Sequence, residues 1–72
     1  MELAIIRRYL RAIDALTKHP STDVRKFAWE MIDSIIEFPA SEILGPIHSR
    51  DFSQLTPNEK LLRTMAGYGR IR

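Results

Sequence analysis

The sequence predicts an all-α fold, in which two long helices form a hairpin and a shorter third helix covers part of it. Two segments repeat apolar residues at helical spacing, prolines separate these segments, and a set of helix-start residues precedes the third. A chain of 72 residues provides one hydrophobic core at most. We therefore expect a single helical domain over residues 1–66, followed by a basic tail over residues 67–72 that is flexible unless a partner orders it.

The first predicted helix covers about residues 2–18. It has no glycine or proline, and its apolar side chains fall on one arc of about 180° when residues are placed at helical spacing. Pro20 prevents continuation, because proline lacks the amide hydrogen that the helical ladder needs. The apolar side chains of this arc are Leu3, Ile5, Ile6, Tyr9, Leu10, Ala12, Ile13 and Leu16.

The second predicted helix covers about residues 22–37. Ser21 and Asp23 offer side-chain oxygens that cap free amide groups at a helix start. Pro39 stops the helix, because the residue before a proline disfavours the α region. The apolar arc spans about 200° and contains Val24, Phe27, Ala28, Trp29, Met31, Ile32, Ile35 and Ile36.

Residues 39–56 are predicted to form a loop. The pair Gly45-Pro46 interrupts the helical pattern, so at most one helical turn, over residues 40–44 and closed by Gly45, is expected there.

The third predicted helix covers about residues 57–66. Thr56 is placed to act as its N-cap, Pro57 occupies the first helical position, and Glu59 completes a capping box. Gly67 ends it.

Each long helix carries two apolar seams, although a helix needs only one seam to pack against one neighbour. In the first helix one seam is formed by Leu3, Ile6, Leu10 and Ile13, and the other by Ile5, Tyr9, Ala12 and Leu16. In the second helix one seam is formed by Val24, Ala28, Met31, Ile35 and Phe38, and the other by Arg25, Trp29, Ile32 and Ile36. Two hairpins packed as a dimeric four-helix-type bundle would bury the surplus seams, and this is the arrangement that we expect. The alternative is a monomer in which apolar residues of the 39–56 loop cover them.

Five residues are predicted to contact another protein: Tyr9, Arg25, Trp29, Ile32 and Ile36. Trp29 lies at the edge of its apolar arc, where tryptophan is enriched in binding hot spots. Arg25 lies inside the arc and is the least expected residue there. For Trp29 and Tyr9 a role in the core is the competing interpretation. The predicted function is a small protein-binding module, an adaptor, inhibitor or assembly factor, whose partners are a second copy of the chain and an unidentified protein.

A DNA-binding transcriptional regulator is the alternative function. The net charge of +2 is too small to indicate nucleic acid by itself, and the second predicted helix is rich in acidic residues. The third helix and the tail suit DNA better, through Asn58, Lys60, Arg63, Arg70 and Arg72.

The sequence shows no pattern that predicts catalysis, a cofactor or a metal. The chain has no cysteine, and its two histidines, His19 and His48, are far apart in the sequence. His48-Ser49-Arg50-Asp51 has the residue types of a hydrolase triad, but triad members converge from separate segments. The glycines of Gly67-Tyr68-Gly69 lack the strand and helix of a phosphate-binding loop. The protein is therefore not expected to be an enzyme.

The first segment also bears on location. Arg7, Arg8, Arg11 and Lys18 form a basic strip that is either a solvated face or a contact for an acidic surface. These charges interrupt any apolar stretch of a signal peptide, and no run approaches the ~18 apolar residues that span a bilayer. A cytoplasmic protein is expected.

Overall fold

Four α-helices and one short 3₁₀ helix make up the computed structural model, which describes residues 1–69. The predicted all-helical class is confirmed for this part of the chain. The helices, in chain order, are α1 (Leu3–Leu16), α2 (Thr22–Glu37), α3 (Ala40–Ser49), η1 (Phe52–Gln54) and α4 (Pro57–Met65).

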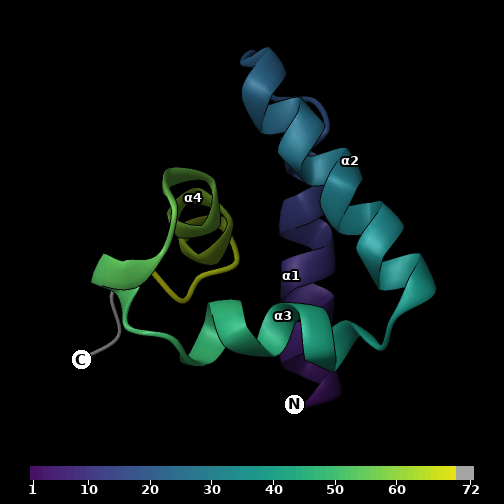
Figure 1. Ribbon diagram of the computed structural model, residues 1–72, viewed down its shortest axis with the longest axis vertical. Coiled ribbons are helices and arrows are strands. Elements are labelled where there is room, and N and C mark those ends of the chain that lie inside the picture. Colours follow the sequence, from purple (N-terminus) through teal and green to yellow (C-terminus); the bar gives the residue numbers. More distant parts are fainter. Residues whose placement is uncertain (70–72) are drawn as a thin grey trace.

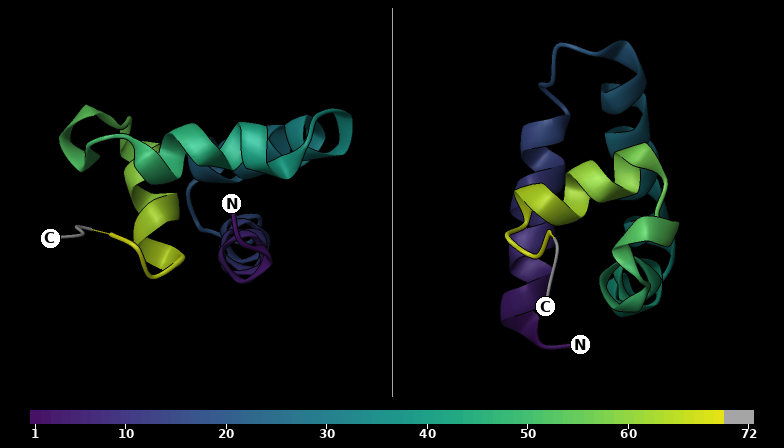
Figure 2. Two further views of the ribbon diagram at one scale, coloured as in Figure 1. Left: turned by 90° about the horizontal axis from the view of Figure 1, so that it is seen from below. Right: turned by 90° about the vertical axis from the view of Figure 1, so that its left-hand side faces the viewer.

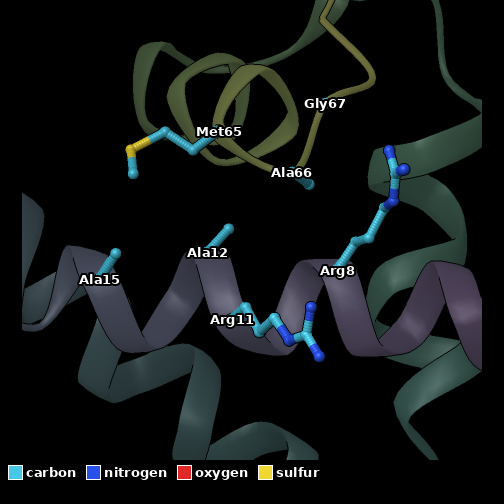
Figure 3. A pocket seen from close by; sticks show the side chains of 7 residues that line it. All are labelled: Arg8, Arg11, Ala12, Ala15, Met65, Ala66 and Gly67. Atoms are coloured by element: carbon cyan, nitrogen blue, oxygen red, sulfur yellow. The ribbon is translucent and has the colours of Figure 1, made fainter.

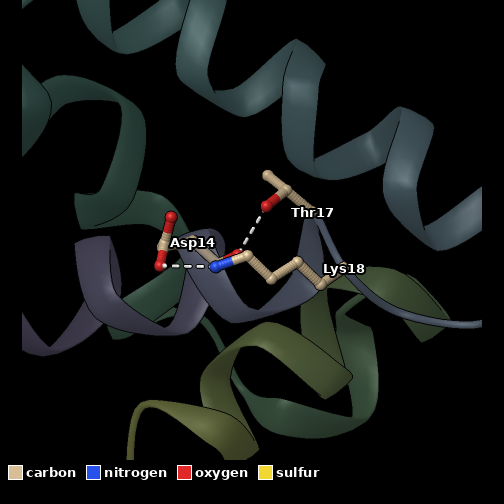
Figure 4. A network of polar contacts seen from close by, with 3 residues as sticks. All are labelled: Asp14, Thr17 and Lys18. Atoms are coloured by element: carbon tan, nitrogen blue, oxygen red, sulfur yellow. Dashed lines mark hydrogen bonds and ion pairs between the residues drawn. The ribbon is translucent and has the colours of Figure 1, made fainter.

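The first two helices run antiparallel and form a hairpin (Figure 1). α1 ends two residues before the predicted end, where the Thr17 hydroxyl donates to the Asp14 carbonyl oxygen at 2.5 Å (Figure 4). Ser21 caps α2, since its hydroxyl accepts from the Val24 amide at 3.4 Å. Arg25 holds the intervening turn by donating to the carbonyl oxygen of His19 at 2.7 Å. The short connection thus has a defined shape, which fixes how α2 lies against α1.

The segment predicted as a loop contains a ten-residue helix instead, so that expectation is wrong for α3. Gly45 does not end the helix: it lies inside it and lacks the positive φ of a glycine cap. Its missing Cβ explains the outcome, because part of the clash between a proline ring and the preceding residue involves that residue's Cβ. Pro46 therefore fits in the helix at the cost of one ladder hydrogen bond.

The start of α4 is the one that the sequence predicts. The Thr56 hydroxyl accepts from the Glu59 amide at 3.2 Å, and the Glu59 carboxylate accepts from the Thr56 amide at 3.0 Å. Gly67 follows the helix with φ +94°, a conformation that residues with a Cβ rarely adopt. The chain then turns back, and Tyr68 stacks on Tyr9 with ring centroids 5.8 Å apart. The first part of the predicted tail is thereby ordered without any partner.

α1 lies at the centre of the molecule and contacts each of the other three α-helices. α3 crosses one end of the hairpin, and α4 lies across one side of it (Figure 2). Together they cover a core to which every α-helix contributes. The largest fully buried side chains are Tyr9, Ile13, Leu16, Leu44 and Leu62.

A group of polar side chains is enclosed beside this core. The Tyr9 hydroxyl lies 2.9 Å from His48 Nδ1, and burial raises the pKa of Tyr9 to about 12, so Tyr9 keeps its proton. Arg63 is only 5% exposed and donates to the carbonyl oxygens of Arg50 at 2.6 Å, Tyr68 at 2.8 Å and Ile47 at 3.3 Å. These bonds tie α4 to the end of α3.

Candidate protein-interaction surface

The two seams of each long helix differ in their exposure to solvent. One seam of each faces the core: Ala12 and Leu16 on α1, and Ala28 on α2, are at most 4% exposed. The other seams are partly open to solvent. Leu3 and Leu10 on α1 are 61% and 41% exposed, and Trp29 and Ile36 on α2 are 57% and 77% exposed. Each long helix thus buries one seam within the chain and presents part of the second.

The exposed seam of α1 points away from α4. Arg8 and Ala12 line a depression together with Ala66 at the end of α4, so they mark the side of α1 that faces α4. On a helical wheel, Leu3 and Leu10 lie about 170° from this side.

The exposed seam of α2 points away from α4 as well. Asp23 accepts a hydrogen bond from the Asn58 side chain of α4 at 3.2 Å and so marks the α2 side that faces α4. Trp29 and Ile36 lie about 130° from Asp23 around the wheel. The two exposed seams therefore share one side of the hairpin, and α4 lies on the other side (Figure 2, left).

We call this surface the hairpin face. Its floor is formed by two half-buried residues that pack against the core, Ile6 on α1 and Ile32 on α2. A group of apolar side chains gathered on one side of a small protein is typical of an interaction site, whereas single exposed ones are ordinary. The hairpin face consists of Leu3, Ile6, Leu10, Trp29, Ile32 and Ile36.

Opposite charges border the hairpin face on its two outer flanks. On α1 the residues beyond Leu3 and Leu10 are Arg7 and, farther around the helix, Arg11, which also borders the depression beside α4; both are exposed. On α2 the residues beyond Trp29 and Ile36 include Asp33 and Glu37, also exposed. One flank is basic and the other acidic.

Of the five residues predicted to contact a protein, the structure brings three together on this face: Trp29, Ile32 and Ile36. Arg25 lies beside them, but its guanidinium is engaged by the turn, through the carbonyl oxygens of His19 and Pro20 at 2.7 and 2.9 Å and the Thr22 hydroxyl at 2.9 Å. It orders the hairpin rather than reaching outward.

Tyr9 is fully buried and hydrogen-bonded to His48, which is the core role that the sequence already offered for it. The two exposed leucines that α1 contributes to the hairpin face, Leu3 and Leu10, were not among the predicted contact residues. The sequence groups both leucines in the seam that does not include Tyr9, but it does not show which of the two seams is buried.

The residues proposed for DNA contact are mostly occupied within the chain. Asn58 donates to Asp23, and the Lys60 ammonium lies 5.6 Å from the centroid of the Phe52 ring. Arg63, expected on the surface of α4, lies in the interior, so this expectation is wrong for its exposure. The apolar pattern of the sequence could not have predicted the burial of Arg63, because backbone carbonyl groups hold its guanidinium. Arg70 and Arg72 lie outside the described residues.

The residues of the basic strip of α1 lie in different environments. Arg8 and Arg11 belong to the lining of an open depression of about 380 Å³ between α1 and α4 (Figure 3). The Arg8 guanidinium extends to the C-terminal end of α4 and lies 5.4 Å from the Tyr68 ring centroid, whereas Arg11 points away from α4. Lys18 pairs with Asp14 at 3.7 Å, where both side chains are well exposed (Figure 4).

Within residues 1–69, no group of three or more histidine, aspartate or glutamate side chains is arranged to hold a metal ion. None of the helices in this range combines the length and apolar character needed to cross a bilayer. Comparison with protein-family models, curated proteins and solved structures gives no match. The hairpin face is therefore interpreted from its own geometry.

Proposed function

We propose that this protein is a small protein-binding module that acts through the hairpin face and works as a homodimer. The observation that carries the proposal is the gathering of four exposed apolar side chains, Leu3, Leu10, Trp29 and Ile36, on the side of the hairpin that α4 leaves open. Binding of a partner removes such apolar area from water, and this burial stabilises the complex. An adaptor, inhibitor or assembly factor needs such a surface and no catalytic group.

The alternative, a DNA-binding regulator, has less support. A recognition helix presents side chains to base edges, whereas α4 keeps Arg63 inside and Asn58 and Lys60 against neighbouring side chains.

Self-association tests the proposal. In sedimentation equilibrium at micromolar concentrations, the wild-type chain is expected to associate, and the double variant Trp29→Ser/Ile36→Ser is expected to remain monomeric. Met65→Ser is the matched control, because Met65 is also exposed (47%) but lies on α4, away from the hairpin face. A wild-type chain that stays monomeric, or a double variant that associates as well as the wild type, would contradict the proposal.

A further inference from the structure

We infer that the hairpin face receives a second copy of this chain in one defined arrangement, with α1 of each chain packed antiparallel against α2 of the other. The twofold axis would run along the hairpin, between the two hairpin faces. This inference rests on the proposed function and goes further, because it states which surfaces meet and in which orientation.

The first argument is the charge of the α1 flank. Arg7 and Arg11 lie beyond the apolar stripe of α1, on the side away from α2, and both are exposed. Asp14 also lies on this side, but it pairs with Lys18 at 3.7 Å. The flank beside the middle of α1 is therefore basic.

The second argument is the charge of the α2 flank. Asp33 and Glu37 lie beyond Trp29 and Ile36 in the C-terminal half of α2. α2 extends past the end of α1 at the turn, and this offset places its C-terminal half level with the middle of α1 (Figure 1). The basic and acidic flanks thus lie at a similar level along the hairpin.

Two twofold arrangements bring the hairpin faces together, and charge distinguishes them. An axis along the hairpin keeps each level and exchanges the helices, so Arg7 and Arg11 face Asp33 and Glu37 of the partner subunit. An axis across the hairpin sets α1 against α1, so the arginines face the same arginines of the partner subunit. Opposite charges across an interface favour the first arrangement, and like charges disfavour the second.

The size of the surface predicts a modest affinity. α1 and α2 are about 21 and 24 Å long and, lying side by side, offer roughly 450 Å² per chain, or about 900 Å² for the dimer. This area lies below the range of about 1,200–2,000 Å² that stable protein interfaces bury. We expect a dissociation constant in the micromolar range, on which the flanking charges have a measurable effect.

Charge reversal tests the arrangement. Arg7→Glu/Arg11→Glu and Asp33→Lys/Glu37→Lys are each expected to weaken self-association about tenfold, because each places like charges opposite one another. The four substitutions combined are expected to restore it to near the wild-type value. The control is the charge swap Glu42→Lys/Arg50→Glu, which changes exposed residues of α3 and its end, outside the hairpin face. Circular dichroism verifies that every variant is folded.

Cross-linking provides a second measurement, since the natural chain has no cysteine. A mixture of Arg7→Cys and Glu37→Cys chains is expected to form cross-linked dimers with a short bifunctional reagent, and Arg7→Cys alone is not. Cross-linking of Arg7→Cys alone would overturn the arrangement, as would charge-reversed variants that associate like the wild type. If Trp29→Ser/Ile36→Ser still abolishes association in that case, the proposed function stands and only the orientation fails. A monomeric wild-type chain overturns both.

Discussion

Arg63 carries a charged side chain, yet it is buried and joins separate segments of the chain. Its guanidinium donates to the carbonyl oxygens of Ile47 and Arg50, which lie at the C-terminal end of α3, where the helix dipole favours a positive charge. A third bond, to the Tyr68 carbonyl oxygen, fixes the chain after α4. The buried charge is thus held by carbonyl dipoles, and it joins the end of α3, α4 and the residues that follow α4.

Replacing Arg63 by methionine is expected to destabilise the protein by about 2–3 kcal/mol, because buried carbonyl groups lose charged donors. Urea denaturation followed by circular dichroism measures this loss. Arg50→Met is the control, since the Arg50 side chain is exposed, and it is expected to change stability by less than about 0.5 kcal/mol. Equal stabilities of the two variants would show that the Arg63 hydrogen bonds contribute nothing.

His48 makes stability depend on pH. Burial, together with the nearby positive charge of Arg63, lowers the pKa of His48 below its ordinary value of 6.5. The unfolded chain therefore binds more protons than the folded chain near pH 6, and the free energy of unfolding rises with pH in this range. In structural terms, a protonated Nδ1 no longer accepts the Tyr9 hydroxyl hydrogen bond.

We accordingly expect the wild-type chain to lose stability as the pH falls from 7 through the lowered pKa of His48, and His48→Gln to lose less. Urea unfolding at a series of pH values gives both slopes. A His48→Gln slope equal to that of the wild type would refute this explanation.

At the scale of elements, α3 is the helix whose local sequence agrees least with its structure. Pro46 lies at an interior position of α3 and is exposed, so it supplies neither a ladder hydrogen bond nor much packing. The helix forms because Leu44 and Ile47 bury their side chains against the rest of the core. Tertiary packing therefore outweighs a local preference against helix.

Pro46→Ala is expected to stabilise the protein by about 1–2 kcal/mol, because alanine restores the amide donor and removes the ring. Pro57→Ala is the matched comparison: Pro57 occupies the first position of α4, where proline is favourable, and its loss is expected to destabilise by about 0.5 kcal/mol. Thermal unfolding by circular dichroism gives the signs. If both substitutions shift the midpoint in the same direction, position within the helix is not what decides the effect of proline here.

At the scale of the whole molecule, the chain closes its core by itself. Its radius of gyration is 11.2 Å, which matches the value of about 11 Å expected for a compact chain of this length. α4 covers one side of the hairpin and α3 crosses one end of it, so the exposed residues of the hairpin face lie outside the core. Residues 39–56 do supply apolar cover, through Leu44 and Ile47 of α3, but they leave the hairpin face exposed.

The sequence predicts α1, α2 and α4 well because their apolar arcs and caps are local signals. It does not predict α3, since the Gly45-Pro46 pair indicates a break and the stabilising contacts are distant in sequence. The presence of two seams follows from periodicity, but which seam is buried does not, because both are similarly apolar. That choice depends on where α3 and α4 pack. Leu3 and Leu10 are therefore recognised as part of the hairpin face only from the structure.

The position of Trp29 has a spectroscopic consequence. It is the only tryptophan of the chain, and it is 57% exposed in the folded state. Its indole is already surrounded largely by water, so unfolding changes its emission wavelength little, whereas coverage of the hairpin face moves it to the blue. We therefore expect the intrinsic fluorescence of this protein to respond to coverage of the hairpin face more than to unfolding. The chain carries its own label at the surface where a partner is expected.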